Sequence, residues 1–151
     1  MRDPDKGEII IIEESENLYE QVKKFLGTEN YSYRIISRGI QAKEFLLQEH
    51  CLPEIVFFDD QGTGMRGMEF LKQIHAEKIE YNIILIVSDI SEKLFSEAIK
   101  AGAADVVEKN IDFNQNLHHA ILRLQKLQRL KKEKQSKESE RKYKELSSLL
   151  P

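Results

Sequence analysis

Residues 53–60 read PEIVFFDD, a short apolar run that ends in two aspartates. A run of β-branched and aromatic residues that follows a proline and precedes a glycine-containing loop is typical of a buried strand. Similar runs occur at residues 9–12 (IIII) and 83–87 (IILIV). Because strands without polar alternation are covered on both faces, these three runs indicate the centre of a parallel sheet packed between helices.

Two weaker strands complete the predicted sheet. Residues 32–36 alternate as an edge strand does, and residues 105–107 form the fifth strand. Helical spacing separates the strands, with apolar positions at Leu18, Val22, Phe25 and Leu26, at Ile40, Phe45 and Leu46, at Met68, Leu71 and Ile74, and at Leu94, Phe95, Ala98 and Ile99. Five βα repeats with right-handed crossovers predict an α/β, flavodoxin-like, doubly wound five-stranded parallel sheet of strand order 2-1-3-4-5.

The length and composition limit the class of protein. The chain has 151 residues and a net charge of −3, which suits one domain with an appended element. Residues 1–8 lack the apolar core of a secretory signal, and no run approaches the ~20 apolar residues of a membrane span, so we expect a cytoplasmic protein. The single cysteine, Cys51, excludes an internal disulfide and disfavours a thiolate metal site. Residues 1–130 carry 16 basic and 22 acidic side chains, which argues against direct binding of nucleic acid.

A last helix is predicted from Asn114 onward, with an apolar stripe at Leu117, Ala120, Ile121, Leu124 and Leu127. Residues 131–142 contain no apolar residue, so a solvated helix, a weak coiled coil or a flexible linker is expected there. Apolar spacing resumes at Tyr143. We expect this extended helix to lead toward a further domain.

Polar residues follow each predicted central strand: Glu13 and Glu14, Asp59, and Ser88. Because the carboxyl ends of parallel strands share one edge, these side chains should converge with Lys109, which follows the fifth strand. Carboxylates ~4 Å apart repel by roughly 4 kcal/mol per pair at an effective dielectric of 20. A Mg²⁺ ion bound by these oxygens would offset that repulsion.

The remaining two groups suit a phosphate ligand. The Lys109 ammonium can contact a phosphoryl oxygen as a point charge, and the Ser88 hydroxyl can donate a hydrogen bond to another. A carboxylate beside Mg²⁺ and an ammonium is a nucleophile for phosphoryl transfer. The expected product is an aspartyl phosphate on Asp59.

The residues from 8 to about 125 resemble the receiver domains of two-component response regulators. The acidic pair after the first strand is Glu13-Glu14, and the aspartate after the third strand is Asp59, whose loop ends in Gly64-Met65-Arg66-Gly67. The serine after the fourth strand is Ser88, and the lysine after the fifth is Lys109. This resemblance implies that Asp59 accepts phosphate from a phosphohistidine. It also implies a Mg²⁺ site formed by Glu13, Glu14, Asp59 and the backbone carbonyl of Gln61.

The same resemblance implies partners and an output. The partner would be a histidine kinase or a phosphotransfer protein, and a homodimer would form through the fourth helix, fifth strand and last helix or through the C-terminal helix. The domain would promote its own phosphorylation without being an enzyme, and we expect contact with neither nucleic acid nor a membrane. A receiver domain would cover residues 8–127, and residues 128–151 would link it to a downstream domain.

The last stretch, residues 138–151 (ESERKYKELSSLLP), resembles the entry helix of PAS sensor domains. The whole protein would then be a receiver joined to a PAS sensor or part of a hybrid histidine kinase.

Several residues depart from the receiver pattern. The acidic pair is Glu-Glu where an aspartate is usual, Asp89 follows Ser88 where a small residue is usual, Val106 replaces the aromatic switch residue, and Asn110 replaces the proline after the lysine. These departures keep a second hypothesis open, a pseudo-receiver that serves as an interaction module without phosphate chemistry. A third hypothesis is a flavodoxin-like cofactor protein, which is disfavoured because the first loop lacks a GxGxxG motif.

Overall fold

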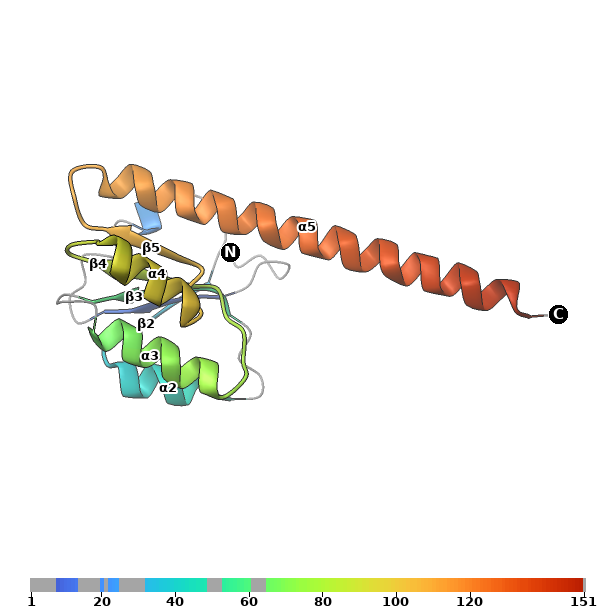
Figure 1. Cartoon of the computed structure of the whole chain (residues 1–151), viewed down its shortest axis with the longest axis horizontal. Coiled ribbons are helices and arrows are strands. Elements are labelled where there is room, and N and C mark those ends of the chain that lie inside the picture. Colours follow the sequence, from blue (N-terminus) through green and yellow to red (C-terminus); the bar gives the residue numbers. More distant parts are fainter. Residues whose placement is uncertain are drawn as a thin grey trace. The chain divides into compact units, whose positions relative to one another are not determined.

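The computed structural model describes residues 8–13, 20, 22–24, 32–48, 53–60 and 65–150. Five strands form one all-parallel sheet in the order β2-β1-β3-β4-β5 (Figure 1). Their bounds are β1 (Glu8–Ile12), β2 (Ser32–Ile36), β3 (Pro53–Asp59), β4 (Ile83–Val87) and β5 (Asp105–Glu108). The predicted fold class and strand order are therefore confirmed.

Helices connect the strands. Their bounds are α2 (Gly39–Leu46), α3 (Met65–Ala76), α4 (Glu92–Lys100) and α5 (Phe113–Ser148). Within the segment predicted to form the first helix, Glu20 and residues 22–24 are helical, and Val22 is buried. The rest of that segment lies outside the described residues.

Burial across the sheet follows the apolar pattern of the strands. All five residues of β4 are buried, as are residues 9–12 of β1, because these runs have no polar face to expose. By contrast, Arg34 and Ile35 of β2 are exposed, as expected for a strand at the edge. The alternating sequence of residues 32–36 thus matches the observed position of β2.

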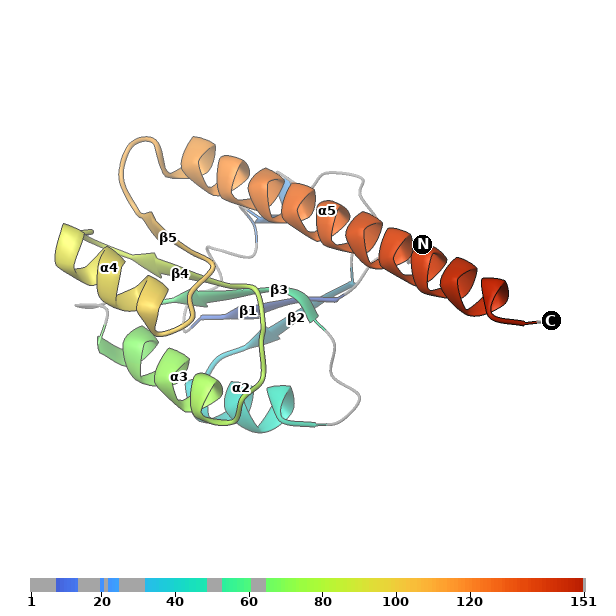
Figure 2. The ribbon, with the colours of Figure 1, turned by 45° about the vertical axis from the view of Figure 1, so that its right-hand side comes forward.

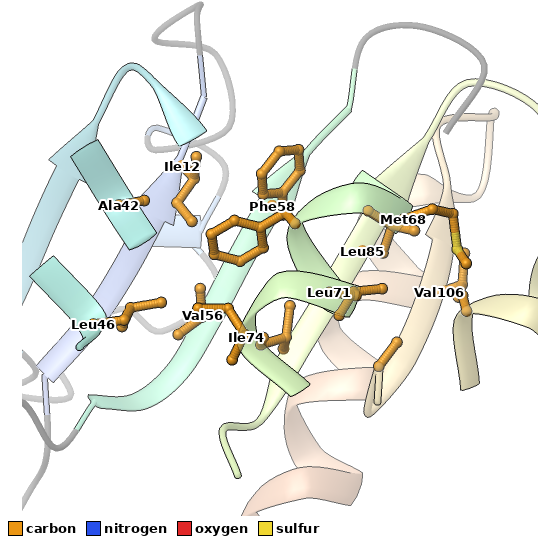
Figure 3. Packing of buried hydrophobic residues seen from close by; sticks show 14 of the residues in the cluster. Ile12, Ala42, Leu46, Val56, Phe58, Met68, Leu71, Ile74, Leu85 and Val106 are labelled. Atoms are coloured by element: carbon orange, nitrogen blue, oxygen red, sulfur yellow. The ribbon is translucent and has the colours of Figure 1, made fainter. Parts of the chain in front are cut away.

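The sheet is covered on both faces. Helices α2 and α3 lie on one face, and the first turns of α5 lie on the other (Figures 1 and 2). Successive strand residues point to opposite faces, so Ile10 and Ile12 join the core cluster beneath α2 and α3. Figure 3 shows this cluster, in which Val56 and Phe58 of β3 meet side chains from the helices.

The ends of α4 are fixed by local hydrogen bonds. The Ser91 hydroxyl accepts a hydrogen bond from the Leu94 amide at 3.1 Å, which caps the N-terminus. At the other end Gly102 has a φ of 111°, and the Ala103 amide donates to the Ala98 carbonyl at 2.9 Å. This is a Schellman ending, in which glycine allows the left-handed turn into β5.

The chain forms two compact units, residues 1–120 and residues 121–151. Helix α5 continues for 36 residues as one element, and the side chains of residues 131–142 are exposed along its length. The structure thus shows a helix in that segment rather than a flexible linker. None of the helices in the described ranges combines the length and apolarity that crossing a bilayer requires.

Gly67 lies at a close approach between α3 and β4. A Cβ atom at this position would be 2.1 Å from Leu85 Cδ1, well inside van der Waals contact. Leu85 is fully buried among core side chains, so it has little room to move. Only glycine therefore fits at the start of α3 with the present packing.

Substitution of Gly67 by alanine should lower the free energy of unfolding by about 1–3 kcal/mol because the core must shift to admit the methyl group. Urea denaturation followed by circular dichroism measures this change. Gly39→Ala is the matched control, since its Cβ would lie 3.6 Å from the nearest atom of Phe58, an ordinary contact. Equal stability of the two variants would contradict the close packing at Gly67.

Candidate phosphoacceptor site

Two buried carboxylates lie side by side at the carboxyl ends of β1 and β3. Ile12 pairs with Phe58 in the parallel ladder, so the next residues, Glu13 and Asp59, are neighbours on adjacent strands. Their exposed fractions are 3% and 6%. The Glu13 amide donates to the Ile36 carbonyl of β2 at 3.1 Å, which fixes the backbone at this point. Both carboxylates are therefore held in a poorly solvated position that favours a compensating positive charge.

Lys109 supplies that charge. Its Nζ lies 2.5 Å from Asp59 Oδ1, and the exposed fractions of the two side chains are 33% and 1%. This contact is an ion pair without a hydrogen bond: within the described part of the chain, Asp59 Oδ1 accepts no hydrogen bond. The expected meeting of groups from the third and fifth strands is thus observed.

Ser88 follows β4 on the same edge of the sheet. Val87 pairs with Glu108, and the Lys109 amide donates to the Val87 carbonyl at 2.9 Å, so Ser88 and Lys109 are neighbours in the ladder. The Ser88 side chain is exposed. Because side chains alternate along each strand, the register places Ser88 and Lys109 on the same side of the sheet as Asp59.

The donor set suits a hard divalent cation. Carboxylate oxygens are hard ligands of the kind that Mg²⁺ prefers, and Glu13 and Asp59 place two such groups at one edge. Two further predicted ligands, Glu14 and the Gln61 carbonyl, lie outside the described residues. Among the described residues no cluster of three or more histidine, cysteine, aspartate or glutamate side chains forms a metal site.

A third buried carboxylate, Asp60, was not predicted from the sequence. Its exposed fraction is 3%, and its Oδ2 accepts a hydrogen bond from the Gly67 amide at 2.8 Å. Its own amide donates to the Ile86 carbonyl at 2.8 Å. Asp60 therefore links the end of β3 to β4 through its backbone amide. Its side chain links the end of β3 to the first turn of α3, across the loop that follows the candidate phosphoacceptor Asp59. An aspartate near a helix N-terminus is the signal that could have found it.

The departures from the receiver pattern take distinct positions. Val106 is 6% exposed and belongs to the core cluster, so no ring occupies this position. Asp89 is exposed beside Ser88. Asn110 is exposed and participates in a hydrogen-bonded turn after β5.

A doubly wound parallel sheet with an acidic edge and an opposing lysine defines an α/β domain whose candidate site lies at the carboxyl ends of the strands. The sequence matches the family "Response regulator receiver domain" over residues 9–122. The chain therefore belongs to this family and is a receiver domain of two-component signalling. A search of curated proteins found no match.

Solved receiver structures share this fold. The signal receiver domain of a protein described as a Luxo repressor from Vibrio parahaemolyticus is 24% identical, with a TM-score of 0.66 over 83% of this chain and 96% of that chain. The signal receiver domain of an HD domain-containing protein from Pseudomonas fluorescens is 22% identical, with a TM-score of 0.64 over 82% and 98%. A phosphorylated cyanobacterial phytochrome response regulator, RcpA, is 15% identical, with a TM-score of 0.60 over 76% and 89%.

Replacement of Lys109 by methionine should lower the free energy of unfolding by about 1–2 kcal/mol, because Asp59 would lose its compensating charge. The effect is limited because a third of the lysine side chain is exposed, at 33%. A double-mutant cycle with Asp59→Asn, measured by urea denaturation, isolates the pair. The lysine substitution should cost markedly less in the Asp59→Asn background, and additive effects would contradict the ion pair.

Proposed function

We propose that this chain is a phosphoacceptor receiver whose Asp59 is phosphorylated in a Mg²⁺-dependent reaction. The phosphoryl donor is the phosphohistidine of a histidine kinase or a phosphotransfer protein. The observation that carries the proposal is the ion pair between Lys109 and the buried Asp59 beside Glu13. Its structural neighbour RcpA, described as phosphorylated, supports the same chemistry on this fold.

The proposed reaction is a direct phosphoryl transfer. An oxygen of the Asp59 carboxylate attacks the phosphorus atom, and the new O–P bond forms as the N–P bond of phosphohistidine breaks. The bond electrons leave with the imidazole of the donor. Lys109 then exchanges its carboxylate partner for a phosphoryl oxygen, and the Ser88 hydroxyl donates a hydrogen bond to another.

The metal ligands in this proposal are Glu13, Glu14, Asp59 and the backbone carbonyl of Gln61. When bound, Mg²⁺ would neutralise negative charge on the carboxylates and the phosphoryl group. Burial of Glu13 and Asp59 keeps most water away from these two carboxylates and strengthens their interactions. The chain would promote its own modification in this way without turning over a substrate.

The proposed output passes through α5. Phosphorylation would change the segment after Ser88 and the surface of α4, β5 and α5, and residues 128–151 would carry the change from a receiver domain of residues 8–127 to a downstream domain. Because Val106 is a buried aliphatic residue, the change cannot use rotation of an aromatic ring at this position. A cytoplasmic location fits a partner kinase that uses intracellular phosphodonors.

A second candidate function, the pseudo-receiver, is favoured by Asp89. Its carboxylate is exposed beside Ser88, where it would repel an incoming phosphoryl group. In this alternative the domain keeps the receiver fold as an interaction module. Phosphorylation assays separate the two functions directly.

Incubation with Mg²⁺ and acetyl phosphate should add one phosphoryl group to the wild-type chain, as measured by the mass of the intact protein. The adduct should be absent from Asp59→Asn and from reactions that contain EDTA. Glu69→Gln, an exposed carboxylate change on α3, is the control and should leave the adduct unchanged. If the wild-type chain accepts a phosphoryl group neither from acetyl phosphate nor from a phosphorylated histidine donor, the result would favour the pseudo-receiver.

Dimer formation should be detectable by analytical ultracentrifugation before and after phosphorylation. Two pairs of exposed apolar residues mark the two proposed surfaces, Phe95 and Ile99 on α4, and Leu146 and Leu150 at the end of the chain. Substitution of both residues of a pair by glutamate should weaken the dimer if that pair lies in the dimer interface, because charges would be placed in an apolar contact. Glutamate at the other pair should have no effect. A monomer at every concentration in both phosphorylation states would contradict a homodimer.

A further inference from the structure

The backbone around Lys109 is held by hydrogen bonds on both sides of the residue. The Lys109 amide donates to the Val87 carbonyl of β4 at 2.9 Å. The next amide, that of Asn110, donates to the Glu108 carbonyl at 3.0 Å and closes a three-residue turn with Lys109 at its centre. The lysine therefore leaves the sheet from a defined backbone position.

The side chains of the two neighbours reinforce this turn. Glu108 Oε2 accepts a hydrogen bond from Asn110 Nδ2 at 2.8 Å, and Glu108 Oε1 accepts one from the Ile90 amide at 2.9 Å. Asn110 Oδ1 in turn accepts from the Asp112 amide at 2.9 Å. Both oxygens of the carboxylate and both polar atoms of the amide are thus used. Together they connect the turn after β5 to the segment after β4.

The Glu108 side chain points to the opposite face of the sheet from the Lys109 side chain, so the two side chains have different roles. Consecutive residues at the end of a strand point to opposite faces, so Glu108 faces away from the Asp59 side while Lys109 faces toward it. Glu108 contacts the segment that follows Ser88. Its carboxylate acts on the backbone that carries the lysine, and the ammonium remains paired with Asp59.

A lysine needs such support because its long side chain is flexible. Residue 110 is asparagine, whose φ is free, whereas a proline would fix this angle covalently. A charge-assisted hydrogen bond between Glu108 and Asn110 can supply the missing rigidity. We propose that Glu108 and Asn110 are positioning residues that hold Lys109 opposite Asp59. This inference rests on the proposed phosphoacceptor function.

The test exchanges donor and acceptor within the pair. In Glu108→Gln an oxygen can still accept from the Ile90 amide, but the new amide nitrogen faces the Asn110 nitrogen, donor against donor. In Asn110→Asp two carboxylates face one another. The double variant E108Q/N110D restores one donor and one acceptor in reversed order, with oxygens still available to the Ile90 and Asp112 amides.

Each single variant should slow phosphorylation by acetyl phosphate at saturating Mg²⁺ by about three- to tenfold, the factor for one hydrogen bond. The double variant should return to within about twofold of the wild-type rate. Because Glu13 and Asp59 are unchanged and a loosened Lys109 competes less with the cation, the Mg²⁺ affinity of all three variants should not fall below that of the wild type. A loss of metal affinity together with rate would indicate general structural damage and overturn the assignment.

Glu8→Gln is the matched control. It makes the same chemical change in a glutamate whose Oε1 pairs with Arg34 Nε at 2.9 Å, at the start of β1. This variant should leave the phosphorylation rate unchanged. A rate for E108Q equal to that of E8Q, or a double variant that fails to recover, would overturn the positioning role.

A second measurement decides the positioning role without phosphorylation. Nitrogen-15 NMR of the lysine side chains reports the exchange of ammonium protons with water, and the Lys109 signal is assigned by its loss in Lys109→Met. Exchange should be faster in E108Q than in the wild type and E8Q, and slow again in E108Q/N110D. Unchanged exchange in E108Q would overturn the inference. If the wild type takes up no phosphate, the proposed function fails while this comparison still gives a result.

Discussion

The structure depends on how one edge of the sheet accommodates buried negative charge. Glu13, Asp59 and Asp60 are all at most 6% exposed, an arrangement that water cannot stabilise by itself. The fold offsets this cost with different groups. Lys109 pairs with Asp59, and the Gly67 amide donates to Asp60. The same concentration of negative charge that makes this edge costly is what would attract a cation, and a bound cation together with Lys109 would in turn attract a phosphoryl group.

The sheet and most of the edge could be predicted because the pattern of each strand is simple. Continuous apolar runs at residues 9–12 and 83–87 identify central strands, and alternation at residues 32–36 identifies the edge. Once the strand order is known, topology alone brings Asp59 and Lys109 to one edge, and the observed ion pair follows. The roles assigned to these residues stay predictions.

What the sequence did not reveal depends on side-chain direction and on turns. The position of Asp59 was predicted, but the burial of Asp60 and its hydrogen bond from the Gly67 amide depend on which way each side chain points at the end of β3. The contact of Glu108 with Ile90 joins the end of β5 to the segment after β4, 18 positions apart in the sequence, so no local pattern marks it. The length of α5 also exceeded what apolar spacing indicated, because its exposed middle is helical without an apolar stripe.

The uninterrupted course of α5 constrains how its length can vary. Residues 131–142 have no apolar contacts to keep, so many substitutions there should be tolerated. Insertions and deletions differ from substitutions, because each added residue rotates one end of a helix by about 100° relative to the other. Changes of seven residues nearly restore the angular phase, while changes of two or five reverse or displace it. The number of residues in this segment, more than their identity, therefore sets the direction in which the far end of α5 faces relative to its start.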